Sequence, residues 1–274
     1  MKMKMKNLCG NFCTLAAIAC ALLTVSCSSG DDDVKLNVAN SGAFSKVKLC
    51  SVDVDGAPFA KYSFNTDGLL SQVKINGEGV VTLSYNPFDI SSDYFDGNET
   101  VNDAGFLSKV ELSEGVINYL YNGNCQLTKI DYGSLLGASA PVGGINIEWK
   151  GGAIGQVTSP IDVFGGGTDA LGVFKFDYTA SFPNKLGQWP LFLGSILVYG
   201  DDYSFTTMSC GLLGIAPEKF PGKIVYAKGE ITVLFEFDYQ FNADGSIAVE
   251  AVSHMSSRNG QLLDEGTMKF VYNY

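Results

Sequence analysis

The stretch Ile231-Thr-Val-Leu-Phe-Glu-Phe-Asp-Tyr-Gln-Phe241 has apolar or aromatic side chains at its odd positions and mostly polar side chains at its even positions. A period of two is typical of a β-strand with one buried face and one water-facing face. The next residues, 242–245, read Asn-Ala-Asp-Gly, which is the composition of a tight turn, and Ile247, Val249 and Ala251 alternate again. Residues 231–252 therefore predict a β-hairpin with an aromatic face turned to a core.

The same unit recurs along the chain. A strand that ends in an aromatic residue meets Asn/Asp-Gly, whose glycine accepts the positive φ of the turn, and a leucine two residues later begins the return strand. The predicted copies are residues 61–75, residues 81–112 with an inserted segment, residues 117–130, residues 145–157, residues 174–186 with a degenerate turn at Asn184, and residues 231–252. Residues 268–272 form a last strand.

Repeated hairpins predict the fold class. One hairpin is barely stable alone, so successive hairpins must pair edge to edge into an antiparallel meander of roughly 12–16 strands. A flat sheet of that size would expose two edges and an apolar face, and the 32 glycines supply bends for curling it. We expect an all-β, curled or barrel-like antiparallel sheet. The alternative is a two-layer β-sandwich.

The N-terminus has the layout of an export signal. Lys2, Lys4 and Lys6 precede an apolar run over residues 15–25, which is shorter than the about 20 residues of a transmembrane helix. Val25-Ser26-Cys27 resembles the end of the lipobox of bacterial lipoproteins, which implies a lipid on Cys27. Cys20 is the alternative acceptor, and an ordinary cleaved signal is a second alternative.

These features divide the chain into three parts. Residues 1–26 are the predicted signal peptide, residues 27–46 a lipidated cysteine with a polar tether, and residues 47–274 a repeated β-hairpin domain. The polar Ser28 to Asp33 stretch resembles the export tether of Bacteroidetes-type surface lipoproteins. Membrane contact is expected through the lipid alone, because several acyl chains together hold a protein stably.

The repeats carry a second resemblance. Their Tyr-x-x-x-Gly-x-Leu-x-x-Ile pattern resembles the YD-type repeats of bacterial surface proteins. Together with the lipoprotein start, residues 47–274 resemble the Bacteroidetes lipoproteins of unknown function that have a porin-like β domain. This resemblance implies a β fold and an outer-membrane, surface-exposed address, and it supplies no catalytic residues. The polar outward positions of the predicted strands argue against a lipid-facing barrel.

Charge and cysteine content exclude several classes of partner and site. Removal of residues 1–26 takes away three lysines and no acid, so the net charge falls from −11 to −14. Nucleic acid and anionic headgroups need basic contacts and are therefore not expected partners. Cys50, Cys125 and Cys210 remain besides Cys27, and we expect buried free thiols, although the sequence leaves one disulfide open.

Three segments interrupt the repeat and are candidate functional loops or covers for sheet edges: residues 88–101, 133–144 and 199–222. The first is the best metal candidate, since an acidic loop with a glycine can supply oxygen ligands to calcium. The predicted calcium ligands are Asp89, Asp93, Asp96, Asn98 and Glu99. No other cofactor is expected. The alternative is that this segment is an acidic, solvated loop without a metal ion.

Exposed aromatic residues would suit sugar stacking. Most strand aromatics are expected in the core, and Trp189 lies off the alternating pattern, which makes it the best candidate for exposure. The predicted binding residues are Trp189, Tyr94, Phe95, Tyr199 and Tyr203. Their expected partner is a glycan or a surface protein.

Catalytic arrangements are weakly supported. The one histidine, His254, is expected at the surface or at a strand end, and no Gly-x-Ser-x-Gly motif presents a nucleophile to it. Residues 165–169 are glycine-rich without the ending of a phosphate loop. We expect a non-enzymatic binding or structural module. The alternative is a glycoside hydrolase that uses two carboxylates, with candidates Glu148, Asp177, Glu236 and Asp238.

Overall fold

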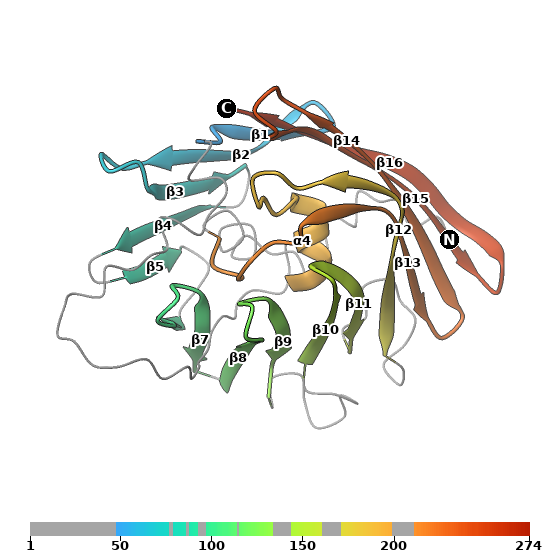
Figure 1. Ribbon diagram of the computed structural model, residues 1–274, viewed down its shortest axis with the longest axis horizontal. Coiled ribbons are helices and arrows are strands. Elements are labelled where there is room, and N and C mark those ends of the chain that lie inside the picture. Colours follow the sequence, from blue (N-terminus) through green and yellow to red (C-terminus); the bar gives the residue numbers. More distant parts are fainter. Residues whose placement is uncertain are drawn as a thin grey trace.

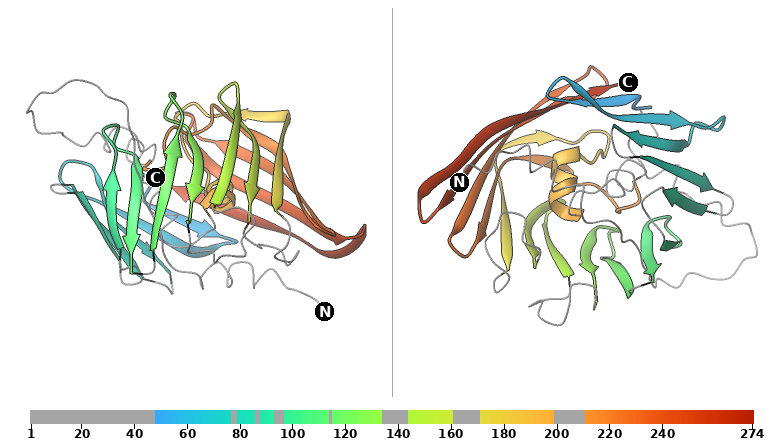
Figure 2. Two further views of the ribbon diagram at one scale, coloured as in Figure 1. Left: turned by 90° about the horizontal axis from the view of Figure 1, so that it is seen from below. Right: turned by 180° about the vertical axis from the view of Figure 1, so that it is seen from behind.

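The computed structural model describes residues 48–76, 79–85, 88–92, 97–113, 115–133, 144–160, 171–198 and 211–274. These residues form one antiparallel sheet of 16 strands with a short helix beside its inner face (Figures 1 and 2). The elements are β1 (Ser51–Val54), β2 (Ala57–Phe64), β3 (Leu70–Ile75), β4 (Val80–Tyr85), β5 (Phe88–Ser92), β6 (Gly97–Val101), β7 (Leu107–Leu112), β8 (Gly115–Tyr121), β9 (Leu127–Asp131), β10 (Gly144–Lys150), β11 (Ala153–Ser159), β12 (Gly172–Pro183), α4 (Leu191–Val198), β13 (Lys219–Lys228), β14 (Ile231–Phe241), β15 (Ile247–Arg258) and β16 (Gln261–Asn273).

The sheet curls into a nearly closed barrel. Apart from β5 and β6, consecutive strands pair with each other, and β1 pairs with β16, so the two ends of the domain lie side by side in the wall. The one seam that is not sealed lies between β5 and β6, the two ends of the sheet order. The predicted antiparallel meander and its curled, barrel-like form are confirmed, and the two-layer sandwich is not what the chain forms.

The opening stretch behaves as its pattern predicts. Along β14, residues 231, 233, 235, 237 and 239 are buried and face the interior, whereas Thr232, Glu236, Asp238 and Gln240 are exposed. Aromatic rings of β14 stack along the inner face, with Phe237 and Tyr239 parallel at a centroid separation of 6.0 Å. The barrel therefore has an apolar inner wall.

The return strand departs from its predicted phase. The register shifts at the start of β15, where Phe241 pairs with Ile247 but Gln240 pairs with Val249. This bulge leaves Ala248 without a partner on β14, and a bulge reverses which residues of a strand face the core. Val249 and Ala251 therefore face outward, against our expectation, and Glu250 and Val252 face inward.

The recurring turn has a defined geometry. In the Asn65 turn, Asn65 Oδ1 accepts the backbone N–H groups of Asp67 and Leu69, the Asn65 N–H donates to Leu69 O, and Gly68 has a φ of 80°. The turns at Asn102, Asn122 and Asn242 repeat the backbone hydrogen bond from the asparagine to the fourth residue after it. In the Asn122 turn the residue at positive φ is Cys125, at 58°, and not the expected Gly123.

Several strands lie where the sequence predicted interruptions. The polar segment 88–101 contains β5 and β6, and β13 (Lys219–Lys228) begins within the predicted third interruption, residues 199–222. Short strands such as β5 (FDISS) and β6 (GNETV) have too few apolar residues for periodicity to reveal them. The apolar stretch 191–198 has the length of a strand but forms the helix α4 instead.

The fifth predicted hairpin is interrupted by a long insertion. Asn184 begins a turn in which its Oδ1 accepts the Gln188 N–H at 2.9 Å, as Oδ1 does in the turns at Asn65, Asn102 and Asn122. Its own backbone N–H, however, donates to Glu218 O at 2.9 Å, where the other turns use the fourth residue. We call residues 185–217 the insert, of which the structure describes 185–198 and 211–217. Asn184 and Glu218 are thus the two ends of one expanded turn, and Figures 1 and 2 show α4 inside the ring of strands.

Candidate functional site

The insert fills part of the barrel interior with apolar side chains. Phe192 of α4 lies against three rings of the inner wall, with centroid separations of 5.3 Å to Phe235, 5.9 Å to Phe237 and 6.3 Å to Phe270. Leu191 and Leu193 are fully buried. Fully burying one such side chain contributes about 1.5–3 kcal/mol, so these contacts hold α4 firmly to strands β14 and β16.

A buried carboxylate lies where α4 begins. Glu250 of β15 has no exposed surface, and its Oε2 accepts hydrogen bonds from the Tyr272 hydroxyl at 2.8 Å and the Phe192 backbone N–H at 3.3 Å. Its Oε1 accepts the Tyr239 hydroxyl at 3.3 Å. A carboxylate at a helix N-terminus is stabilised by the free N–H groups and by the helix dipole. Glu250 therefore joins three wall strands to the insert.

Burial dominates the ionisation of this cluster. Desolvation raises the pKa of Glu250 to about 7, although hydrogen bonds from Tyr272, Phe192 and Tyr239 act in the opposite direction. Desolvation and the nearby Glu250 also raise the pKa of Tyr239 and of Tyr272 well above the ordinary value of a phenol. The two tyrosines thus remain hydrogen-bond donors over the physiological range, and Glu250 is the member of the cluster that titrates near neutral pH.

A second group of polar contacts fixes the point where the insert enters the interior. Gln188 is buried; its Oε1 accepts the Ile247 N–H at 2.9 Å and its Nε2 donates to the Tyr274 hydroxyl at 3.0 Å. Asn184 Nδ2 donates to Gln188 O at 2.8 Å and to Pro217 O at 2.7 Å. The two ends of the insert are therefore held together by one asparagine side chain.

The returning arm of the insert contacts the opposite wall. The Leu107 N–H of β7 donates to Leu212 O at 2.8 Å, and the Tyr121 hydroxyl of β8 donates to the same oxygen at 3.2 Å. The Trp189 indole N–H donates to Gly214 O at 3.3 Å, which joins the two arms. The insert thus spans the interior from β14–β16 to β7–β8 as a brace.

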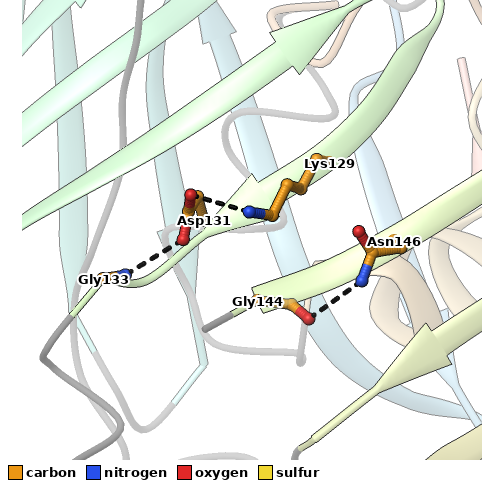
Figure 3. A network of polar contacts seen from close by, with 5 residues as sticks. All are labelled: Lys129, Asp131, Gly133, Gly144 and Asn146. Carbon is orange, nitrogen blue, oxygen red and sulfur yellow. Dashed lines mark hydrogen bonds and ion pairs between the residues drawn. The ribbon is translucent and has the colours of Figure 1, made fainter. Parts of the chain in front are cut away.

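The outer wall has the reverse polarity. Exposed polar or charged side chains lie on its outward positions around the barrel: Lys61, Lys74, Thr82, Asp89, Thr100, Glu111, Glu148, Lys175, Glu236, Asp238, Ser253, Glu265 and Lys269. Figure 3 shows one such region, where Lys129 Nζ contacts Asp131 Oδ2 at 2.7 Å and the Gly133 N–H donates to Asp131 Oδ1 at 3.2 Å. Partial burial opposes ionisation of Asp131, but Lys129 and Gly133 outweigh it and lower its pKa.

The predicted aromatic platform is not assembled by the described residues. Trp189 is only 2% exposed, so its expected exposure is wrong. The reason is that it lies on the insert, whose side chains supply the core of a barrel that is too wide for its wall residues to fill. Tyr94, Phe95, Tyr199 and Tyr203 lie outside the described residues, and their proposed role in binding stays a prediction.

The acidic segment 88–101 is partly strand rather than loop. Asp89 and Asn98 are exposed on the outer face, whereas Glu99 lies beside the inward-facing Val110 in the register of β6 and β7. Asp93 and Asp96 lie outside the described residues, so the calcium site stays a prediction. Within the described part of the chain, no three histidine, cysteine or acidic side chains gather as a metal site would require.

The residues considered for catalysis are dispersed. His254 is buried on the inner face of β15, not at the surface, with Nε2 at 3.5 Å from Asp264 Oδ2. Glu148, Asp177, Glu236 and Asp238 are exposed on the outer wall, on three different strands. Residues 165–169 lie outside the described part.

The cysteines differ from one another. Cys50 is exposed and not buried as expected, because it precedes the first strand of the wall; Cys125 is half-buried, and both are free thiols. Cys210, the lipidation candidate Cys27 and its alternative Cys20 lie outside the described residues, as do residues 1–47. None of the described helices is long and apolar enough to cross a membrane.

The inward position of Glu250, the central residue of this site, is not visible in the simple alternation of its strand. Simple alternation places Glu250 between Val249 and Ala251 on the water-facing side of its strand, and the bulge at Ala248 reverses that assignment. The alternation does resume in the new phase at Val252 and His254, which is the only local signal of the shift.

Comparison with known proteins bears on the fold alone. No protein-family model matches the chain, and no curated protein matches it. Among solved structures it is similar to a porin-like protein from Bacteroides uniformis, with a TM-score of 0.57 and 13% sequence identity over 82% of this chain and 97% of that one. The shared feature is a porin-like antiparallel β-barrel.

Proposed function

We propose that this chain is a non-enzymatic binding or structural module that stands in water at the cell envelope and is held to the outer membrane by a lipid on Cys27. The observation that carries the proposal is the polarity of the barrel, which has charged side chains outside and an apolar interior braced by the insert. The porin-like fold neighbour and the lipobox-like sequence around Cys27 support an envelope location.

The alternative is a membrane-embedded pore, and the physical chemistry of the wall argues against it. A transmembrane barrel needs an outward apolar band about 25 Å tall, and each lysine at the bilayer midplane costs about 2–4 kcal/mol. Here Lys61, Lys74 and Lys175 are exposed on three strands, and Glu236 and Asp238 face outward on a fourth. A water-filled channel needs a polar lumen, whereas this inner wall is apolar.

The one fully buried carboxylate of the described residues, Glu250, supports a role in stability over one in catalysis. Both of its oxygens accept hydrogen bonds from groups that fix the insert. An acid or nucleophile must instead be within reach of a substrate.

Fractionation of the Cys27→Ala protein tests the proposal. The wild-type protein, produced in a Gram-negative host that processes lipoproteins, should incorporate labelled palmitate and sediment with the envelope until detergent is added. Cys27→Ala should lose the label and be recovered without detergent, and Cys20→Ala should behave as wild type. A Cys27→Ala protein that resists extraction from membranes by carbonate would show a lipid-embedded barrel and overturn the proposal.

A further inference from the structure

The longest strand of the barrel runs beyond its neighbour. β16 has 13 residues, but β1 pairs only with residues 270–273 of it. On its other side, β15 pairs with β16 from Gln261 to Val271. Residues 261–268 therefore have a neighbour on one side only among the described strands. Figure 1 shows the β15–β16 hairpin, in red, running far past the short blue β1.

The backbone groups that face this free edge can be assigned. The Asp55 N–H donates to Lys269 O at 2.8 Å, so the backbone groups of Lys269 point toward the β1 side. In an antiparallel strand alternate residues point to the same side, so those of Thr267 and Glu265 also point there. The register between β15 and β16 is regular from Val271 down to Asp264 and shifts only at Leu263. Beyond β1, these groups meet no strand of the described residues, and the free edge is about 27 Å long.

Residues 261–268 themselves have exposed apolar and acidic side chains, and the nearest cations are at the two ends, Arg258 opposite Gln261 and Lys269 beside β1. Leu262, Leu263 and Met255 are 52%, 47% and 47% exposed, which makes them three of the seven large hydrophobic side chains exposed in the described residues. Met255 lies beside Glu265 in the register. Asp264 and Glu265 lie on opposite faces of β16, and residues 261–268 include no lysine or arginine.

We propose that the free edge of β16 over residues 261–268 binds an extended, basic segment of a partner protein by strand addition. Unpaired edges are templates for such pairing, in which main-chain hydrogen bonds give affinity and side chains give specificity. Glu265 on the outer face selects for lysine or arginine on the same face of the added strand, and the exposed Leu262 and Leu263 favour apolar residues beside them.

Charge decides against a second copy of this chain as the occupant. Antiparallel pairing of two β16 edges would bring carboxylates of one copy beside those of the other, and like charges on facing strands are destabilising. An inward charge and a bulge are also the features by which edges avoid unselective association. The inward charge and the bulge disfavour pairing with an acidic or a uniformly apolar strand, but they allow pairing with a basic strand.

The test uses the full-length protein in detergent and an end-blocked, fluorescent peptide of alternating valine and lysine. Fluorescence anisotropy should show binding that weakens with salt and is absent for a valine–glutamate peptide. Thr267→Pro removes one N–H from the free edge without touching the β15–β16 ladder, and it should weaken binding at least tenfold. Thr267→Val is the matched control and should bind as wild type.

Hydrogen exchange on the wild-type protein tests the same contact without relying on the Thr267→Pro variant, which could lose binding by misfolding. On addition of the valine–lysine peptide, hydrogen exchange should slow at the amides of Thr267 and Glu265. The proposal is overturned if the peptide does not bind, if a backbone N-methylated form binds equally, or if Thr267→Pro instead abolishes self-association of the protein. None of these outcomes depends on the lipid at Cys27, so they are distinguishable from failure of the proposed anchoring.

Discussion

Two turns of the barrel, at Asn242 and at Asn184, start alike and end differently. In both, an asparagine leaves a long strand and a glycine at positive φ follows three residues later, Gly245 in one and Gly187 in the other. At Asn242 the asparagine N–H closes the turn on Ser246, whereas at Asn184 it closes on Glu218. The first turn only reverses the direction of the chain, whereas the second also places the apolar side chains of the insert in the barrel interior.

The two turns also lie side by side. Gln188, four residues after Asn184, bonds to Ile247, five residues after Asn242. A hairpin repeat can thus supply the wall of a barrel but not enough side-chain volume for its interior, because a barrel of about 16 strands is too wide for wall side chains to fill. The remaining interior volume is filled by side chains of the insert, which belongs to one expanded turn.

The largest effect on stability is expected from a variant in which residues 185–217 are replaced by the Ala-Asp-Gly of the Asn242 turn. The variant loses six fully or nearly fully buried side chains: Trp189, Leu191, Phe192, Leu193, Leu212 and Leu213. Removal of a single buried Phe or Leu costs about 2–5 kcal/mol, so the total exceeds a typical stability of 5–15 kcal/mol. We expect loss of cooperative thermal unfolding and strong binding of a hydrophobic dye.

The control for the replacement changes a closed turn instead. Ala243→Thr gives the Asn242 turn the Thr-Asp-Gly sequence of the Asn65 turn, and this protein should unfold as wild type. If the shortened protein also unfolds cooperatively with an unchanged midpoint, the insert is dispensable and the barrel wall is self-sufficient.

A smaller effect concerns the contact between the insert and the wall. Because the pKa of Glu250 is raised from 4.5 to about 7 in the folded protein, folding favours its protonated form. The associated stability is fully present below pH 4.5, is lost as the pH rises toward 7, and changes little above it; the total is about 3 kcal/mol. Glu250→Gln should remove this dependence, as measured by urea unfolding at pH 5, 6, 7 and 8.

Other titrations do not obscure this result. The pKa values of Asp177 and Asp244 are lowered by hydrogen bonds from Thr179 and Ser246, so their contributions are lost only below about pH 4. Glu236→Gln, the same substitution on the exposed outer face, is the matched control. Parallel stability curves for wild type and Glu250→Gln would contradict the role assigned to Glu250.

The asparagines themselves provide a third test. Asn184→Ala removes a side chain that makes two donor bonds and one acceptor bond, and it leaves the carbonyls of Gln188 and Pro217 without that donor. We expect a loss of about 2–3 kcal/mol, against about 1 kcal/mol for Asn65→Ala, whose two backbone partners are exposed at Asp67 and half-buried at Leu69. Equal losses in urea unfolding would mean that Asn184 does no more than an ordinary turn residue.

How much of this the sequence predicts depends on the range of the interactions involved. The alternation of residues 231–241 and the Asn-x-x-Gly turns are local, and they predicted the antiparallel barrel-like wall. The inward position of Glu250 depends on a bulge of one residue, and the burial of Trp189 depends on contacts with Gly214 and the distant wall. Contacts between residues far apart in the chain leave no periodicity in the sequence. The strands of the wall were therefore predictable, and the position of the insert inside the barrel was not.

The smallest expected effect separates the Asn122 turn from the other closed turns. Its fourth position is Cys125, at a φ of 58°, where the turns at Asn65, Asn102 and Asn242 have glycine. A residue with a Cβ in the left-handed region costs about 1–2 kcal/mol, so Cys125→Gly should raise the free energy of unfolding by about 1 kcal/mol despite the greater freedom of the unfolded chain. The reciprocal change Gly68→Ala, where the nearest atom to a new Cβ is 3.8 Å away, should lower the free energy of unfolding by a similar amount.

The hydrogen bond from Ile215 N–H to Cys125 O uses the backbone alone and survives Cys125→Gly. A destabilised Cys125→Gly protein would therefore mean that the thiol itself packs against the insert, which would make this turn the second place, after Asn184, where a repeat has been adapted to hold the core.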